Sequence, residues 1–314
     1  MIELNIFGPG ASPASGASPQ APGAAGPGPA RQRHPPWIKV RLGGGETWAK
    51  VRGILRKNGL HTVCEEAECP NLGECWGHGT ATFLLMGDIC TRGCRFCAVK
   101  NGKPAALDPQ EPERVAEAVE SMGLGFVVLT SVNRDDLADG GSEHIGQTIA
   151  QIKLRRPGCG VEALVPDFRG DRAAVDRVAL APLTVFAHNV ETVPSLYRRV
   201  RPGSDYERSL RVLEMAKETG APKGLLVKSG LMLGLGETRR EIEDVLSDLR
   251  DHGCDLITLG QYLQPSRFEL PVVRYLPPQE FAQLREAALR FGFRRVVSGP
   301  LVRSSYHAWE ALEP

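Results

Sequence analysis

The chain has 314 residues, of which 42% are hydrophobic and 24% charged, and its formal net charge is +1. This near-neutral balance gives no reason to expect nucleic acid or an anionic membrane as a partner. No apolar run reaches the roughly 18 residues that a membrane span needs, and no charged-then-apolar secretory signal opens the chain, so we expect a cytoplasmic globular protein.

Residues 1–36 are predicted to be a flexible tail, because Gly, Ala, Pro and Ser dominate from about residue 8 onward and leave almost nothing to bury. A targeting segment is the alternative interpretation, although the tail contains no acid-free amphipathic helix rich in Arg. Beyond the tail we expect an N-terminal extension at 37–80, a barrel at 81–299 and a C-terminal segment at 300–314.

Six of the eight cysteines fall in one short window. Thiolates select iron–sulfur clusters, zinc or Cu(I), and a [4Fe–4S] cube needs four ligands, so a triplet of cysteines leaves one iron for another ligand. A disulfide framework suits small secreted domains, and structural zinc normally closes with four protein ligands, so both alternatives fit less well. The two triplets are C-x4-C-x5-C at Cys64, Cys69 and Cys75, and C-x3-C-x2-C at Cys90, Cys94 and Cys97.

Apolar strand-like runs alternate with segments of helical period, which predicts an α/β fold of βα units around a parallel sheet. Six or so units are too few for a closed eight-fold barrel, so we expect a partial (β/α)6 TIM-like barrel. Its reactive end is the edge where the strands end, and the second cysteine triplet follows the first strand. The expected strands are 82–86, 125–130, 160–164, 183–187, 225–233, 255–259 and 295–297.

Three helices with one buried face are predicted between these strands, because apolar residues recur there at i, i+3, i+4 and i+7 or nearly so. The recurring residues are Val115, Ala118, Val119 and Met122; Ile242, Val245, Leu246 and Leu249; and Phe281, Leu284, Ala288 and Phe291.

The loop Cys90-Thr-Arg-Gly-Cys94-Arg-Phe96-Cys97 resembles the signature of radical S-adenosylmethionine (SAM) enzymes. The upstream triplet, together with Arg303-Ser304-Ser305-Tyr306 near the end of the chain, narrows this to a resemblance to the lipoyl synthase family. The match runs from about residue 34 to 309, so only the tail falls outside it.

The resemblance implies two [4Fe–4S] clusters. The cluster on Cys90, Cys94 and Cys97 would bind SAM at its open iron and, once reduced by an external electron donor, cleave it to methionine and a 5′-deoxyadenosyl radical. The other triplet would hold an auxiliary cluster that donates sulfur, with a serine as its fourth ligand. Ser305 matches the family's ligand position, and the spacing alone does not exclude Ser304.

Polar residues at strand ends are candidates for SAM contacts, although Thr and Asn there are also common turn-formers. Phe96 would pack on the adenine or serve the core. The strand-end candidates are Thr130, Ser131 and Asn133, then Asn189 and Glu191, then Gln261 and Tyr262.

The implied reaction is sulfur insertion at carbons 6 and 8 of an octanoyl chain that is amide-linked to a lysine. The implied partner is a lipoyl-carrier domain or the glycine cleavage H protein. Two other hypotheses remain at this point. One is a different radical SAM sulfur inserter, such as one resembling biotin synthase or a methylthiotransferase. The other is a zinc-stabilised binding protein without catalysis.

Overall fold

The computed structural model describes residues 34–40, 43–306 and 308. Its central sheet has the strand order β1-β2-β5-β6-β7-β8-β9-β10, and every pair from β2 onward is parallel, whereas β1 runs antiparallel to β2. A separate parallel pair, β3 and β4, lies next to the cysteine loop. The strands are β1 His61–Thr62, β2 Thr82–Leu85, β3 Ile89–Cys90, β4 Lys100–Asn101, β5 Phe126–Ser131, β6 Gly160–Leu164, β7 Val185–Ala187, β8 Leu226–Leu233, β9 Leu256–Gln261 and β10 Arg295–Gly299.

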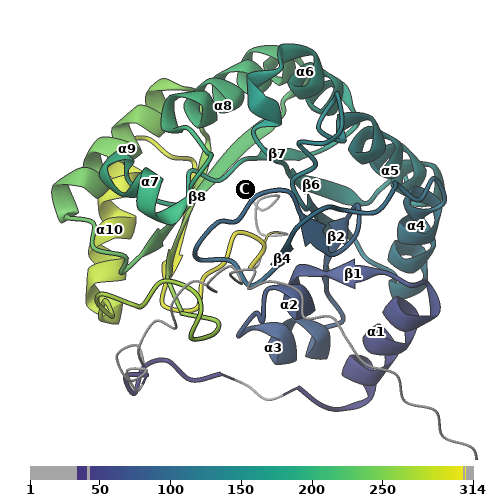
Figure 1. Cartoon of the computed structure of the whole chain (residues 1–314), viewed down its shortest axis with the longest axis horizontal. Helices are drawn as coiled ribbons and strands as arrows, with labels where there is room; N and C mark the ends of the chain where they lie inside the picture. Colours follow the sequence, from purple (N-terminus) through teal and green to yellow (C-terminus); the bar gives the residue numbers. More distant parts are fainter. Residues whose placement is uncertain (1–33, 41–42, 307, 309–314) are drawn as a thin grey trace, which may run out of the picture. The chain divides into compact units, whose positions relative to one another are not determined.

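The longer helices that follow the strands, α4, α5, α6, α8, α9 and α10, surround the outer side of the curved sheet (Figure 1). The helices of the described residues are α1 Glu46–Lys57, α2 Val63–Glu66, α3 Leu72–Gly77, α4 Glu111–Met122, α5 Ser142–Arg155, α6 Arg172–Leu180, α7 Tyr197–Val200, α8 Tyr206–Gly220, α9 Arg239–Asp251 and α10 Pro278–Arg290, with short 3-10 turns at Phe168–Gly170, Pro194–Leu196 and Ala221–Lys223. The α/β fold with a partial barrel of parallel strands is therefore confirmed.

The apolar pattern of α9 shows why the βα units form. Thr238 and Glu241 make a capping box at its start. Its four predicted core residues are almost completely buried against the sheet, and each such side chain contributes about 1.5–3 kcal/mol. They are Ile242, Val245, Leu246 and Leu249.

All seven predicted strands coincide with β2 and β5 to β10, within three residues at each end. The two-residue strands β1, β3 and β4 were not predicted. The predicted buried face of α10 holds for Phe281, Leu284 and Ala288, but the inclusion of Phe291 was wrong. Phe291 is the C-cap residue, one position beyond the last residue of α10, and its side chain is 38% exposed.

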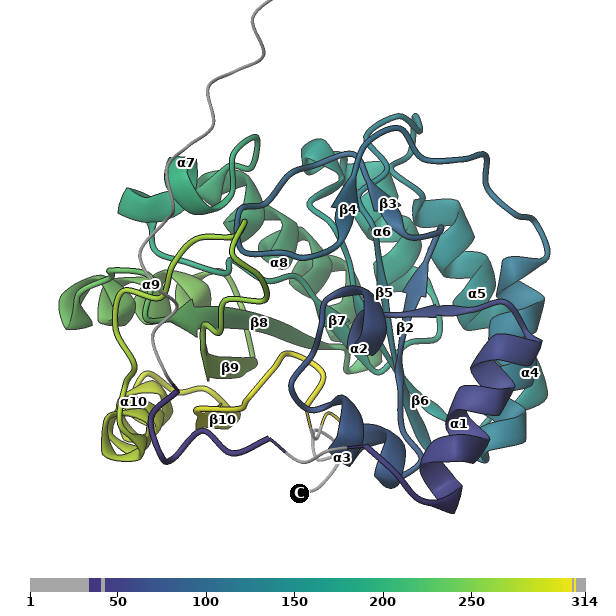
Figure 2. The ribbon, with the colours of Figure 1, turned by 60° about the horizontal axis from the view of Figure 1, so that its bottom comes forward.

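The N-terminal extension and the C-terminal segment meet beside the edges of the sheet. Asn71, which caps α3, donates its Nδ2 hydrogen to the carbonyl oxygen of Leu301 at 2.7 Å. Tyr306 donates its hydroxyl hydrogen to Glu74 Oε1 at 2.9 Å. In Figure 2 the segment that follows β10 reaches toward α3. The two ends of the barrel region are thus joined through the cysteine-bearing helices.

Residues 1–33, which make up most of the predicted tail, and residues 309–314 lie outside the described residues. Among the described helices, none combines the length and the apolar composition that crossing a membrane requires.

Gly260 on β9 makes room for the C-terminal segment, because a Cβ there would lie 2.1 Å from the carbonyl oxygen of Val302. We expect Gly260→Ala to lower the free energy of unfolding by about 1–3 kcal/mol. Gly53 on α1 has open space around it, so Gly53→Ala should raise that free energy by about 0.5–1 kcal/mol. Urea unfolding of both variants measures this, and equal effects would contradict the close approach.

Candidate active site

The second cysteine triplet lies at the C-terminal edge of the parallel strands, as expected. Cys90 ends β3, and the loop that carries Cys94 and Cys97 follows it. The backbone amides of Arg92 and Asn133 donate to Cys90 Sγ at 3.4 and 3.3 Å. The pKa of Cys97 is raised to about 12, mainly by burial and in smaller part by the nearby Cys94 and Cys90. The three thiols therefore lie close enough to affect one another's ionisation.

The first triplet forms a second group on the N-terminal extension. Cys64 lies in α2, Cys75 lies in α3, and Cys69 lies between these helices. The pKa of both Cys64 and Cys75 is raised to about 12, mainly by burial. Cys69 contributes to both shifts, and Cys64 contributes to that of Cys75. All six sulfurs of the two triplets belong to free cysteines. Such thiols lose their protons when a metal binds them.

The C-terminal tetrapeptide lies beside the first triplet. Arg303 is close enough to Cys69 for its charge to lower the pKa of that thiol, although burial is the larger effect and raises it. The guanidinium of Arg303 also donates to the carbonyl oxygen of Gln261 at 3.1 Å. The structure thus brings together two predicted elements that lie more than 200 positions apart in the sequence.

The two serines of this tetrapeptide have different surroundings. Ser304 Oγ accepts a hydrogen bond from Asn189 Nδ2 at 2.5 Å, and its carbonyl oxygen accepts one from Lys228 Nζ at 2.6 Å. Among the described residues no hydrogen-bond partner is found for the Ser305 hydroxyl. Ser304 is therefore occupied by contacts within the fold.

Five buried polar atoms, four at or after the ends of β5 and β7 and one on Arg201 after α7, have no hydrogen-bond partner within the described residues. Buried polar groups normally have partners, so these atoms are candidates for contacts with a bound polar ligand. SAM fits, because it offers amino, carboxylate, ribose and adenine groups. These atoms are Ser131 Oγ, His188 Nε2, Asn189 Oδ1, Thr192 Oγ1 and Arg201 Nε.

Three other residues predicted to contact SAM are Gln261, Tyr262 and Phe96. The polar groups of the first two have hydrogen-bond partners within the fold, and Phe96 has an apolar side chain. Gln261 is completely buried and uses both ends of its amide on backbone groups, including the carbonyl of Arg274 and the amide of Leu276. The Tyr262 hydroxyl donates to the carbonyl of Leu270 at 2.7 Å. Phe96 packs in a small apolar cluster with Tyr262. The side chains of these three residues therefore pack or hydrogen-bond within the fold around the site.

The remaining candidates lie at the ends of β5 and β7. Thr130 is partly buried within β5. Asn133 contributes its backbone, whose carbonyl accepts from Thr91. Glu191 adopts a left-handed backbone with φ 65°. Its pKa is raised by burial, which the positive charge of Arg201 opposes. Strain at a non-glycine residue is typical of functional sites.

A buried charge network that sequence reasoning missed holds the cysteine loop. Arg92 donates to both carboxylate oxygens of Asp135 at 2.7 and 2.9 Å, and to Asp167 at 2.7 Å. Arg208 donates to the other oxygen of Asp167 at 2.8 Å. Burial alone would raise the pKa of Asp167, but the hydrogen bond from Arg92 and nearby positive charge hold it well below its usual range. Only the position of Arg92 between two cysteines signalled it.

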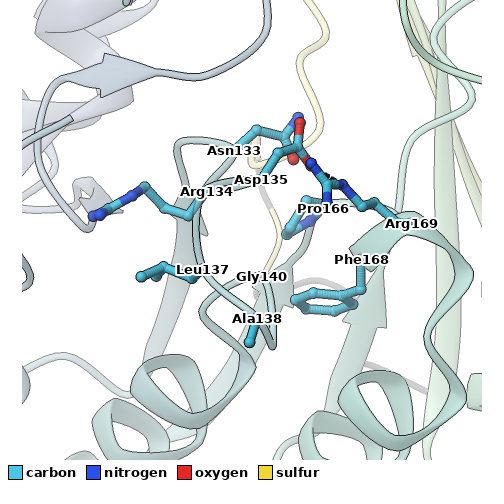
Figure 3. Close-up of a pocket in the computed structure, with 9 residues that line it drawn as sticks. All are labelled: Asn133, Arg134, Asp135, Leu137, Ala138, Gly140, Pro166, Phe168 and Arg169. Atoms are coloured by element: carbon cyan, nitrogen blue, oxygen red, sulfur yellow. Dashed lines mark ion pairs between the residues drawn. The ribbon is translucent and has the colours of Figure 1, made fainter. Parts of the chain in front are cut away.

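Beside this network lies a small pocket between the segments that follow β5 and β6. Asp135, Arg169, Phe168, Pro166 and Ala138 are among its lining residues, and Figure 3 shows the ion pair between Arg169 and Asp135 at its upper rim. The Arg134 side chain extends away from the pocket and donates to the carbonyl of Ala105.

The donor sets fit iron–sulfur clusters. No three His, Cys, Asp or Glu side chains of the described part converge as ligands of a single ion. A cube holds each cysteine on a different iron, so its ligands need not converge on one point. The buried indole N–H of Trp76 is near enough to Cys64 to lower its pKa against the effect of burial, yet it has no hydrogen-bond acceptor among the described residues. A cluster at Cys64 would offer it sulfur acceptors.

Comparisons with known proteins agree with this geometry. The family model of the radical SAM superfamily matches residues 84–249, and that of the N-terminal domain of lipoyl synthase matches residues 25–69. Solved structures share the fold at low identity. Methylornithine synthase is 15% identical with a TM-score of 0.51 over 82% of this chain and 84% of its own. Streptococcus suis SuiB bound to its precursor peptide is 11% identical with a TM-score of 0.54 over 73% and 52%.

Curated relatives cover most of the chain. The lipoyl synthase of Methylococcus capsulatus is 57% identical over 88% of this chain and 85% of its own. That of Halorhodospira halophila is 57% identical over 92% and 86%, and that of Chlorobaculum tepidum is 55% identical over 90% and 96%.

The fold, the cysteine loop and the family model define a radical SAM enzyme. Its sequence relatives place the chain in the lipoyl synthase family, whose reaction is sulfur insertion that makes the lipoyl cofactor with SAM and two [4Fe–4S] clusters. The resemblance stated from the sequence is confirmed, and the biotin synthase-like, methylthiotransferase-like and zinc-protein hypotheses are set aside.

We expect Arg92→Gln to cost about 3–5 kcal/mol of stability, because it leaves the buried Asp167 with Arg208 as its one remaining ion-pair partner among the described residues. It also removes the closer ion-pair partner of Asp135. Arg172→Gln, which breaks exposed pairs with Asp176 and Glu218, should cost no more than about 1 kcal/mol. Urea unfolding of the iron-free chain gives both values. Iron content after anaerobic reconstitution should fall in the Arg92 variant alone. Equal stability in the two variants would contradict the role of the network.

Proposed function

We propose that the two triplets hold the two clusters in separate roles. Cys90, Cys94 and Cys97 are proposed as ligands of the SAM cluster. The second set comprises Cys64, Cys69, Cys75 and Ser305, proposed as ligands of the auxiliary cluster. The observation that carries this assignment is the position of the C-terminal tetrapeptide against the first triplet, with Ser304 occupied by other contacts.

The bound groups supply the redox chemistry and the sulfur, and the chain's residues bind, orient and enclose them. Ser131 Oγ and Asn189 Oδ1, for which the described residues offer no hydrogen-bond partner, are the best-supported SAM contacts. Thr130 and Glu191 are proposed beside them, and the backbone of Asn133 shapes the loop at Cys90. Arg92 holds that loop through Asp135 and Asp167.

The substrate is proposed to be an octanoyl chain on a lysine of a carrier protein, with sulfur inserted at carbons 6 and 8. Unactivated C–H bonds offer no acidic proton, so the chain needs no general base at this site. The reaction of the family supports an octanoylated carrier. A lipoyl-carrier domain and the H protein both satisfy this chemistry, and the electron donor is proposed to be a separate protein.

A reducing compartment, the cytoplasm, is the proposed location, because six cluster cysteines must remain thiols until iron binds. The proposed division of the chain assigns 37–80 to the auxiliary cluster, 81–299 to the barrel and 300–314 to closure of that cluster. The hydrogen bonds from Asn71 to Leu301 and from Tyr306 to Glu74 support this closure.

Two cysteine variants separate the roles of the clusters. Cys94→Ala should abolish deoxyadenosine formation, because SAM would lose its cluster. Cys69→Ala should retain deoxyadenosine formation but give no thiolated product, because only the auxiliary cluster is lost. The assay incubates reconstituted protein with SAM, dithionite and an octanoyl-lysine peptide and detects products by mass spectrometry. Normal deoxyadenosine formation by the Cys94 variant, or a fully lipoylated peptide from the Cys69 variant, would overturn the assignment.

The serine ligand is tested by its conversion to a stronger one. Ser305→Cys should retain iron at the auxiliary site but slow thiolation by at least about tenfold, because a thiolate binds iron more firmly than a hydroxyl does. Ser304→Cys is the matched control, since its side chain faces Asn189 and should leave the spectrum of the auxiliary cluster unchanged. Mössbauer spectra of 57Fe-reconstituted protein distinguish the variants, and a spectrum altered only at position 304 would reverse the assignment.

A further inference from the structure

A buried ion pair spans the interior of the barrel between β6 and β8. Lys228 Nζ lies 2.9 Å from each carboxylate oxygen of Glu162. The Glu162 side chain is completely buried, and that of Lys228 is 6% exposed. Strand β7 lies between the two strands, so the pair bridges two strands that are not neighbours. Neither residue belongs to the cysteine motifs or to the polar groups at the strand ends.

Stability alone does not explain this pair, because apolar residues of similar volume in place of a buried ion pair are often neutral or stabilising. A third hydrogen bond indicates another role. Lys228 Nζ also donates to the carbonyl oxygen of Ser304 at 2.6 Å. An ammonium group has three hydrogens, so Glu162 takes two and the C-terminal segment takes the third.

Ser304 is held from other sides as well. Its hydroxyl accepts from Asn189 Nδ2 at 2.5 Å. The preceding carbonyl of Val302 passes so close to β9 that only a glycine fits at position 260. Arg303 binds the carbonyl of Gln261 at 3.1 Å. The wall of the barrel therefore fixes the backbone directly before Ser305, and the strongest of these contacts comes from the charged Lys228.

We propose that Lys228, oriented by Glu162, is a positioning residue that anchors Ser304 and thereby presents Ser305 to the auxiliary cluster. This inference rests on the proposed assignment of Ser305 as a ligand. It adds to that assignment a buried ion pair inside the barrel that controls the position of the ligand. This pair is distant in the sequence from all six cysteines.

The physical need for such an anchor follows from the weakness of the ligand. A hydroxyl binds iron less firmly than a thiolate, so it cannot by itself offset the loss of conformational entropy on ordering a chain end. Contacts made by Ser304 order the segment in advance, which leaves Ser305 to bind at little entropic cost. Ser305 can then leave the iron while the segment stays in place.

The test replaces both members of the pair, so that no unpaired charge remains buried. In Lys228→Met/Glu162→Leu we expect amide hydrogen exchange at residues 300–306 of the iron-free protein to accelerate by about tenfold or more. After reconstitution, iron should fall from about eight to about seven per chain. The EPR signal of an oxidised three-iron cluster should then appear. Thiolated product should decrease by about 10–100-fold, while the protein still forms deoxyadenosine.

Lys217→Met/Asp255→Asn is the matched control, because it removes both charges of the pair that Lys217 of α8 makes with Asp255 at 2.7 Å, and no hydrogen bond of the described residues joins this pair to the C-terminal segment. It should leave exchange, iron and product unchanged. If the first double variant does not fold, Lys228→Met/Glu162→Gln takes the same measurements with a polar residue at position 162. Glu162→Gln alone keeps the lysine donor, so its exchange at 300–306 should remain close to wild type.

A folded double variant at Lys228 and Glu162 with the amide exchange rate, iron content and amount of thiolated product of the wild type would overturn the proposed anchoring role of Lys228. The same changes in the Lys217→Met/Asp255→Asn variant would also overturn it, since they would reflect general loss of stability. A different result would show that the underlying assignment of Ser305 is wrong. If the wild-type enzyme makes lipoyl product and a Ser305→Ala variant keeps all its iron and its sulfur transfer, Ser305 is not a ligand. Faster exchange at 300–306 in the double variant at Lys228 and Glu162 would still establish the anchor itself.

Discussion

The contact between the two ends of the barrel region is the constraint on which the rest of this structure depends. Three cysteines leave one iron of a four-iron cube without a protein ligand, and in our proposal the auxiliary cluster takes its fourth ligand from the C-terminal segment. Hydrogen bonds join residues 230 and 232 positions apart, from Asn71 to Leu301 and from Tyr306 to Glu74. Contacts so far apart in the sequence carry a large loop-closure cost in an unfolded chain, and the folded strands between them hold the two ends near each other.

The open barrel follows from the same requirement. The C-terminal segment crosses from β10 to the cysteine-bearing helices, and it lies against the inner wall at Gly260. A closed ring of strands filled by side chains would leave no path for it. The polar interior of the barrel, with Glu162, Lys228 and Thr258 buried, is the surface on which this segment is held.

The sequence predicted the repeated units of this fold well, since seven strands and the buried faces of α4 and α9 follow from local apolar period. It did not predict β1, because two residues carry no period, or the exposure of Phe291. The cysteine triplets and the tetrapeptide were visible as motifs. The network around Arg92 was not, since Asp135 and Asp167 come from separate loops and only the sheet brings them together. Gln261 shows the opposite case: its position at a strand end suggested a ligand, but backbone groups satisfy its amide.

The apolar residues that stabilise the fold and the polar residues of the candidate site lie in different layers of the molecule. The space between the sheet and the outer helices is filled by apolar side chains such as Ile149, Val245 and Leu246, which are 0–1% exposed. Inside the barrel, buried charges replace them, and each costs desolvation free energy that its partner only partly returns. Arg201 illustrates this balance, because it donates to two backbone carbonyls and to Tyr197, yet its Nε has no hydrogen-bond partner in the part of the chain that the structure describes. A barrel interior selected for stability alone would favour apolar residues at these positions. The outer layer thus supplies the free energy that allows the inner layer to hold polar groups ready for a ligand.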